Sequence, residues 1–249
     1  MTLYDKYLNG QTREVYQDIE KLGDKAFSDF YFNDIEKVLT ETFERTAYNL
    51  AIIYKDLQQI NYLFKTAPKN NYEKPLHSPL PNTDALLKQL DRAVKPFGYV
   101  PLSLKFFYKI VGGVNFGWDY NTNEDYIWNL ADPVQIASLD AVIETVTDKY
   151  WVQEIKEYVD DEDFGVPFLD LSADYLHKDN ISGGPAYALQ ITNRPGIDSK
   201  FLNEPNNTTF IDYLRICFYN CGFPGIKRPE LQNDYLHFFD RVRPQIKQI

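Results

Sequence analysis

The chain contains 249 residues, of which 44% are hydrophobic and 16% aromatic, so it can bury one substantial core or two modest ones, which excludes intrinsic disorder. Its 36 Asp and Glu outnumber its 26 Lys and Arg, and the formal net charge of −10 argues against nucleic acid or an anionic membrane as a partner. Two cysteines and three histidines are too few for a disulfide scaffold or a Cys/His zinc module, so we expect no metal or cofactor.

The first 20 residues alternate polar and aromatic side chains and contain no apolar run of signal-peptide length. No stretch of about 20 apolar residues occurs elsewhere in the chain. We therefore expect a cytoplasmic protein whose two thiols, Cys217 and Cys221, are reduced.

Residues 12–65 show a helical pattern that is interrupted at residues 28–33. Asn33 and Glu36 resemble a capping box at the start of the second helix. Apolar positions of that helix lie three and four residues apart and form one stripe: Leu39, Phe43, Thr46, Leu50, Ile53, Leu57, Ile60 and Phe64. We expect the stripe to pack against the preceding helix, and the alternative is a coiled-coil-like seam between two copies of the chain.

Residues 67–81 contain four prolines and little apolar periodicity, which is typical of a connector. The connector predicts an N-terminal helical extension, a hairpin, over residues 1–80 and an α+β domain over residues 81–249. The alternative is that both parts form one continuous globule.

In the second part, helical patterns alternate irregularly with short strand-like segments. Helices are predicted at residues 82–94, 101–111, 138–146, 151–158, 209–221 and 229–242. Strands are predicted at residues 114–120 and 126–130, as a hairpin around Asn121–Asn123, and at residues 164–170 and 186–191. This order favours an α+β fold with helices packed on one antiparallel sheet.

The chain lacks the sequence motifs of nucleophile elbows, phosphate-binding loops, dinucleotide sites and zinc proteases. His177 has suggestive neighbours and can be combined with Ser182 into a hydrolytic site, although such a histidine more often fixes loop geometry. Cys217 and Cys221 share one face of a predicted helix, where buried core thiols are the preferred interpretation. We therefore predict no catalytic, cofactor-binding or metal-binding residues.

Charge is concentrated between residues 114 and 163, where 13 acidic residues oppose two lysines. A solvated face and a docking surface for a basic protein are equally plausible explanations, because clustered carboxylates steer cationic partners. Interleaved aromatic residues, among them Trp128, Tyr150 and Trp151, are candidate anchors. The predicted partner-binding residues are Trp118, Asp119, Tyr120, Glu124, Asp125, Tyr126, Glu157, Asp160, Asp161, Glu162 and Asp163. The last four lack the spacing of an EF-hand calcium loop.

Four segments in sequence order resemble the SUKH superfamily, which includes bacterial immunity proteins and fungal regulators of cell-wall glucan synthesis. They are VPLSLKFFYKIVGG at residues 100–113, ADPVQIASLDAV at 131–142, LSADYLHKDNISGGPAY at 171–187, and TFIDYLR at 209–215 followed by GFPG at 222–225. The resemblance covers residues 84–226 and implies an α+β domain of helices on an antiparallel sheet. It implies no catalytic residues.

The resemblance implies a non-enzymatic binding module, foremost an immunity protein that neutralises a cognate toxin such as a nuclease. An acidic inhibitor suits that role, because a nuclease presents cations to phosphate. We expect a monomer or weak homodimer with a basic protein partner, and neither nucleic acid nor membrane. The alternatives are a regulatory scaffold adaptor that assembles through residues 33–65 and, less favoured, a hydrolase that uses His177 and Ser182.

Overall fold

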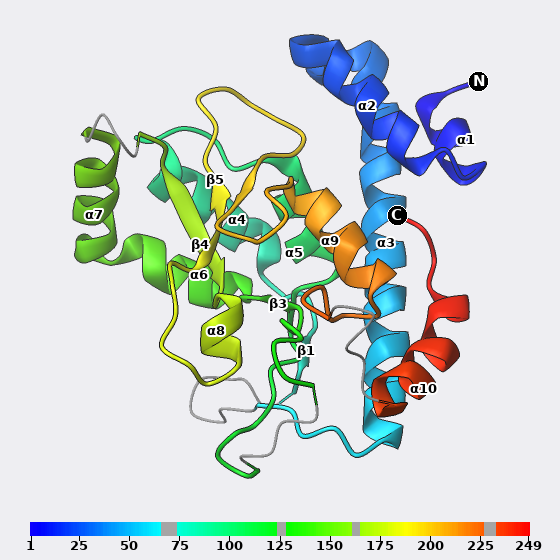
Figure 1. Cartoon of the computed structure of the whole chain (residues 1–249). Helices are drawn as coiled ribbons and strands as arrows, with labels where there is room; N and C mark the ends of the chain where they lie inside the picture. Colours follow the sequence, from blue (N-terminus) through cyan, green and yellow to red (C-terminus); the bar gives the residue numbers. More distant parts are fainter. Residues whose placement is uncertain (66–73, 124–127, 161–164, 227–232) are drawn as a thin grey trace.

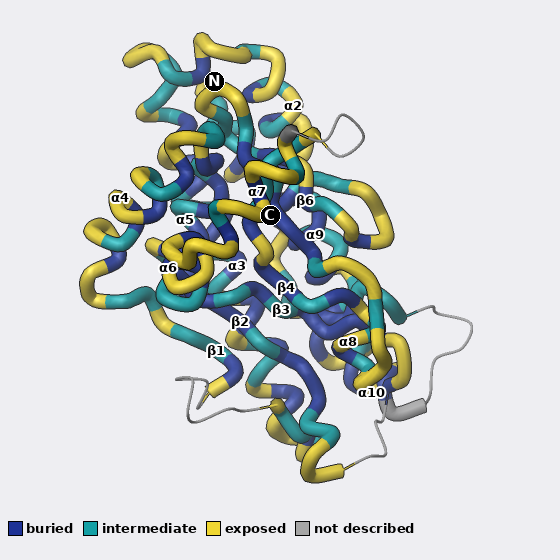
Figure 2. Tube along the Cα trace, turned by 90° about the vertical axis from the view of Figure 1, so that its left-hand side faces the viewer, coloured by how far each residue is buried: buried dark blue, intermediate teal, exposed yellow. Residues whose placement is uncertain are grey.

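A computed structural model describes residues 1–65, 74–123, 128–160, 165–226 and 233–249 (Figure 1). Within these ranges the chain forms ten α-helices and two three-stranded antiparallel sheets. The α+β class predicted from the sequence is confirmed, although the strands form two short sheets where one was expected. Buried residues run through the centre of the molecule, and exposed ones lie mainly on the outer turns of the helices (Figure 2).

The N-terminal part consists of α1 (Leu3–Leu8), α2 (Thr12–Leu22), the 3-10 helix η1 (Gly23–Phe27) and the long helix α3 (Asp29–Gln59). The predicted start of α3 at Asn33 is wrong, because the chain turns into the helix at Ser28, whose backbone is extended. Its predicted continuation to residue 65 is also wrong. Asn61 has a positive φ of 56° that turns the chain, and Phe64 then bridges to Trp118 as in an antiparallel sheet.

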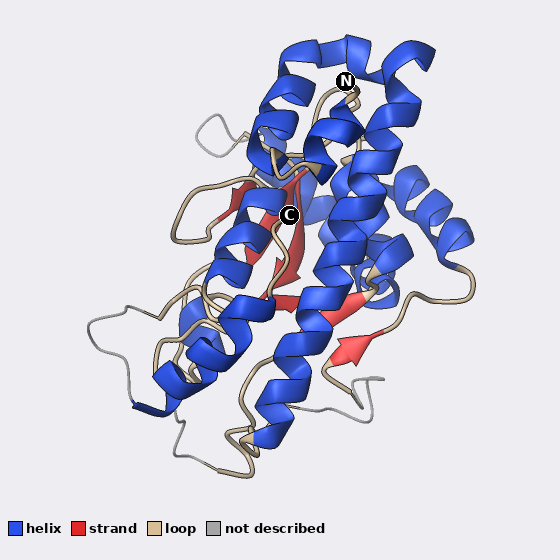
Figure 3. Cartoon of the chain, turned by 90° about the vertical axis from the view of Figure 1, so that its right-hand side faces the viewer, coloured by secondary structure: helices blue, strands red, loops and turns tan. Residues whose placement is uncertain are grey.

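The apolar stripe of α3 is buried inside the single chain, so it is not a seam between two copies. Leu39, Phe43, Leu50, Ile53 and Leu57 are each at most 1% exposed. The predicted partner was the preceding helix, but α3 packs mainly on α1, η1, α5 (Leu102–Ile110) and α10 (Asn233–Val242). Figure 3 shows α10 lying alongside α3.

Polar contacts fasten the C-terminal residues to α3. The buried Asn49 amide donates to the Lys247 carbonyl at 2.8 Å and accepts the Lys247 N–H at 2.8 Å. Arg241 of α10 pairs with Asp56 at 2.6 Å. These contacts satisfy two polar side chains that would otherwise be buried at a cost.

The first sheet crosses the boundary predicted near residue 80. Strand β1 (Leu76–His77) pairs with β2 (Gly113–Asn115), which pairs with β3 (Gln135–Ile136). Gly112 permits this pairing, because it has a φ of +98° and a Cβ there would lie 2.2 Å from the His77 carbonyl oxygen. A strand inside the predicted connector therefore shares one sheet with residues beyond it.

The hairpin predicted for residues 114–130 is not formed as expected. Strand β2 ends at Asn115, and its partners are β1 and β3. Residues 126 and 127 lie outside the described residues, and residues 128–130 form a turn. A three-residue strand that pairs with distant segments leaves little local signal in the sequence.

The second sheet contains β4 (Phe168–Ser172), β5 (Tyr187–Gln190) and β6 (Phe201–Leu202). The Ala137 N–H donates to the Leu171 carbonyl at 2.7 Å and so connects the chain after β3 to β4. The other helices of this part are α4 (Thr83–Val94), α6 (Leu139–Thr147), α7 (Lys149–Asp160), α8 (Tyr175–Lys178), α9 (Phe210–Tyr219) and the 3-10 helix η4 (Arg243–Gln245). Thr209 caps α9 by accepting the Asp212 N–H, as predicted.

We predict that Leu50→Ala lowers the free energy of unfolding by about 2–5 kcal/mol, because it leaves a cavity in the centre of the α3 interface. Chemical denaturation measures the change. The matched control is Glu44→Ala on the exposed face of the same helix, which should change stability by less than about 0.5 kcal/mol. Equal effects of both substitutions would contradict the buried position of the stripe.

Candidate functional site

Helices α6 and α7 carry an exposed acidic surface. Both helices are amphipathic, and α6 buries Leu139, Val142 and Val146. The opposite faces expose four carboxylates, which we call the α6–α7 acidic surface: Glu144, Asp148, Glu154 and Glu157. Within the described part of the chain, no ion pair joins these four to a Lys or Arg. Their negative charge therefore faces solvent.

Asp170 of β4 extends this surface. Its partial loss of solvation and the neighbouring Glu154 carboxylate raise the pKa of Asp170. Like charges on α7 and β4 therefore repel one another, and a cation bound here would relieve the repulsion.

The predicted partner-binding residues do not form one patch. Asp119 and Tyr120 are half-buried, Glu157 is exposed, and Trp118 is buried. Figure 1 places the loop of residues 118–123 at the lower end of the molecule and α7 at its upper left. The remaining predicted residues, Glu124, Asp125, Tyr126, Asp161, Glu162 and Asp163, and the side chain of Asp160, lie outside the described residues.

The three tryptophans belong to the core and not to a surface, so they cannot serve as exposed anchors. Trp118 is 3% exposed and its ring centroid lies 5.0 Å from that of Tyr62. Trp128 packs on Phe223 at 4.7 Å, and Trp151 packs on Phe97. Removing these large rings from water stabilises the folded chain more than leaving them exposed would. Tyr150 remains exposed at the start of α7.

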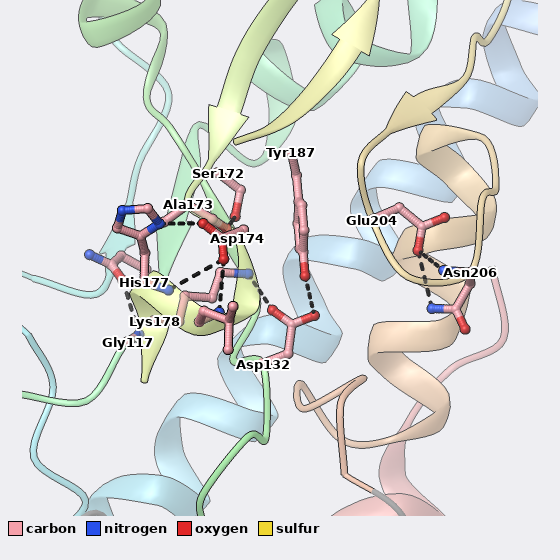
Figure 4. A network of polar contacts seen from close by, with 12 residues as sticks. Gly117, Asp132, Ser172, Ala173, Asp174, His177, Lys178, Tyr187, Glu204 and Asn206 are labelled. Atoms are coloured by element: carbon pink, nitrogen blue, oxygen red, sulfur yellow. Dashed lines mark hydrogen bonds and ion pairs between the residues drawn. The ribbon is translucent and has the colours of Figure 1, made fainter. Parts of the chain in front are cut away.

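A buried ion pair connects the turn at residues 129–132 to α8 (Figure 4). Lys178 Nζ donates to Asp132 Oδ1 at 2.6 Å, and both side chains are 2% exposed. The Tyr187 hydroxyl donates to Asp132 Oδ2 at 3.1 Å, and the Lys178 ammonium lies 4.6 Å from the centre of the Tyr187 ring. Burial and the Asp132 charge raise the pKa of Tyr187, which keeps it a donor. Sequence reasoning missed this triad, because its members lie 46 and 55 residues apart.

His177 is oriented by Asp174, in the manner of a turn-fixing histidine (Figure 4). Its Nδ1 hydrogen bonds to Asp174 Oδ2, and Asp174 also caps α8 by accepting the Leu176 N–H at 2.9 Å. Burial alone would raise the pKa of Asp174, but these hydrogen bonds lower it overall. Both His177 and Ser182 are described and exposed, and no hydrogen bond connects them. A Ser–His nucleophile pair is therefore not assembled.

Cys217 and Cys221 are free and fully buried, as the core interpretation predicted. Burial and the nearby Asp132 charge raise the pKa of Cys217, so the unreactive thiol form dominates. The two residues do not share a helix face, because α9 ends at Tyr219 and Cys221 has a φ of 50°.

A cleft of about 830 Å³ opens beside α8 and is lined in part by Tyr120, Leu130, Asp179 and Ile181. Only Tyr120 was predicted from the sequence. Leu130 and Asp132 have positive φ values of 54° and 52°; aspartate adopts this backbone more often than most residues, but a leucine gives no signal of it.

The described residues contain no group of three or more His, Cys, Asp or Glu placed to hold a metal ion. None of the helices in the described ranges is both long enough and apolar enough to span a lipid bilayer. Comparison with models of protein families, with curated proteins and with solved structures found no match.

We predict that Lys178→Met lowers the free energy of unfolding by about 3–5 kcal/mol, because Asp132 is left charged and buried without its cation. The double variant Asp132→Asn with Lys178→Met should recover part of this loss. Lys156→Met on the exposed face of α7 is the matched control and should change stability by less than about 0.5 kcal/mol. Urea denaturation distinguishes these outcomes, and a mild Lys178 variant would count against the ion pair.

We predict that Asp170→Asn raises the melting temperature at pH 7 and that this gain shrinks as the pH falls. Because folding raises the pKa of Asp170, the folded chain holds more protons above the ordinary Asp pKa of about 3.9, and stability falls as pH rises through that window. Glu154→Gln should act in the same direction. Thermal melts between pH 3 and 7 provide the measurement, and a pH-independent difference would refute the charge explanation.

Proposed function

We propose that the protein is a non-enzymatic module that binds a basic protein, and that it acts as an immunity-type inhibitor of a cationic toxin such as a nuclease. The observation that carries the proposal is the α6–α7 acidic surface, whose four exposed carboxylates have no basic partner in the described part of the chain. The SUKH-like segments support the same function.

Electrostatics makes this surface suited to fast capture. Carboxylates on one face raise the association rate of a cationic partner, and the effect weakens with salt. Asp170 adds a further carboxylate beside α7, and its pKa is raised first by burial and then by the neighbouring Glu154 carboxylate. A nuclease needs cations for its phosphate substrate, so an acidic inhibitor would compete for the same surface.

Two observations make the other functions less favourable. A regulatory adaptor that assembles through residues 33–65 would need an exposed apolar stripe on α3, but that stripe is internal. A hydrolase would need His177 to activate Ser182, but His177 is bonded to Asp174 and not to Ser182.

The test is binding kinetics with a basic partner isolated by pull-down at low salt. We predict that the double variant Glu154→Lys and Glu157→Lys lowers the association rate roughly tenfold at low ionic strength, with a smaller effect on dissociation. The difference should disappear at high salt.

The matched control is the double variant Glu36→Lys and Glu44→Lys. It changes the net charge by the same amount, but on α3, which lies on the opposite side of the molecule from α7 (Figure 1). Its association rate should stay within about twofold of that of the original chain. Equal losses in both double variants would show a general charge effect, and no loss in either would place the interface elsewhere.

A further inference from the structure

The cleft beside α8 combines two exposed apolar side chains with a tyrosine ring, three asparagines and one carboxylate. Leu130 and Ile181 are each 48% exposed, and both line the cleft. Asp179 follows directly after α8 and also lines the cleft. Its Oδ2 accepts the Leu130 N–H at 2.8 Å, which holds the two residues together. The half-buried Tyr120 ring contributes a further wall.

Leu130 has a left-handed backbone beside the cleft, where its N–H donates to Asp179. Its φ of 54° is left-handed, which costs a leucine about 1–2 kcal/mol relative to the usual region, and asparagine or glycine would adopt it more readily. Its side chain is nevertheless half exposed, so the core gains little from it. Strained residues of this kind concentrate at sites that contact ligands.

Asp179 has acceptor capacity to spare. Its Oδ1 is buried without a well-formed hydrogen bond, although the Tyr120 hydroxyl interacts with the carboxylate. Burial and the Asp179 charge raise the pKa of Tyr120. The nearby Lys178 pairs with Asp132, and the His177 ring hydrogen bonds to Asp174. Lys65 lines an adjoining cavity of about 130 Å³ and not the cleft.

We propose that this cleft is the acceptor site for one arginine or lysine side chain of the basic protein partner. The alkyl stem lies between Leu130 and Ile181, and the cationic head reaches Asp179 and the face of the Tyr120 ring. This chemistry fits an amphipathic cation better than a purely apolar or an anionic group. The inference rests on the proposed function and adds to it the residue type that the partner inserts.

The test uses Nα-acetyl-arginine amide as the probe, titrated into the ¹⁵N-labelled full chain and followed by NMR. We expect shifts of the backbone amides of Leu130, Asn180 and Ile181, and weaker shifts with the uncharged norleucine analogue. Asp179→Asn should raise the dissociation constant about tenfold, while its amide oxygen still accepts the Leu130 N–H. Glu36→Gln, which removes an equal charge from the exposed face of α3, should leave the constant unchanged.

Two further variants separate binding from folding. Leu130→Asn suits the left-handed backbone, so it should keep or raise the melting temperature while it weakens binding severalfold. Tyr120→Phe keeps the ring and removes the competing hydroxyl, so binding should be unchanged or tighter. Shifts confined to α6–α7, or an unchanged constant in Asp179→Asn, would overturn this proposal. The acidic-surface proposal is judged separately by the α7 charge-reversal kinetics.

Discussion

The Asp132–Lys178 ion pair is the interaction on which the second half of the molecule depends. A buried pair stabilises only when its remaining hydrogen bonds are satisfied, and here the Tyr187 hydroxyl takes the second oxygen of Asp132. The pair connects the turn after Trp128 to α8, and Tyr187 connects both to β5. The same turn, residues 129–132, also places Leu130 so that its N–H bonds to Asp179. The cleft and the buried ion pair therefore both depend on this turn.

The helices were predictable where apolar spacing and a cap coincide. Thr209 and the stripe that follows it specify α9, and the periodicity of α6 and α7 specifies their buried faces. The strands were less predictable, because β2 has three residues and finds its partners in segments far along the chain. The start of α3 was missed because Asn33 and Glu36 imitate a capping box inside a helix.

The sequence predicted that the candidate site would be acidic, but not which acidic residues would lie together. Acidic residues between 114 and 163 show in the sequence, but their division between α7 and the lower loop follows from tertiary packing. The tryptophans looked like anchors, yet a large ring next to a carboxylate in sequence can still point into the core, as Trp118 does. Leu130 carried no signal, since backbone strain at a leucine is a property of the folded chain.

The hydrogen bonds between Asn49 and Lys247 join two segments that are synthesised far apart in time. The two residues are 198 positions apart, and Arg241 reaches Asp56 over 185. Long-range contacts of this kind form late, because a large loop must close before they contribute. On the ribosome, α3 is synthesised early, but the segment that covers one of its faces is synthesised much later. Part of the α3 surface therefore stays uncovered until residues 233–249 have been synthesised.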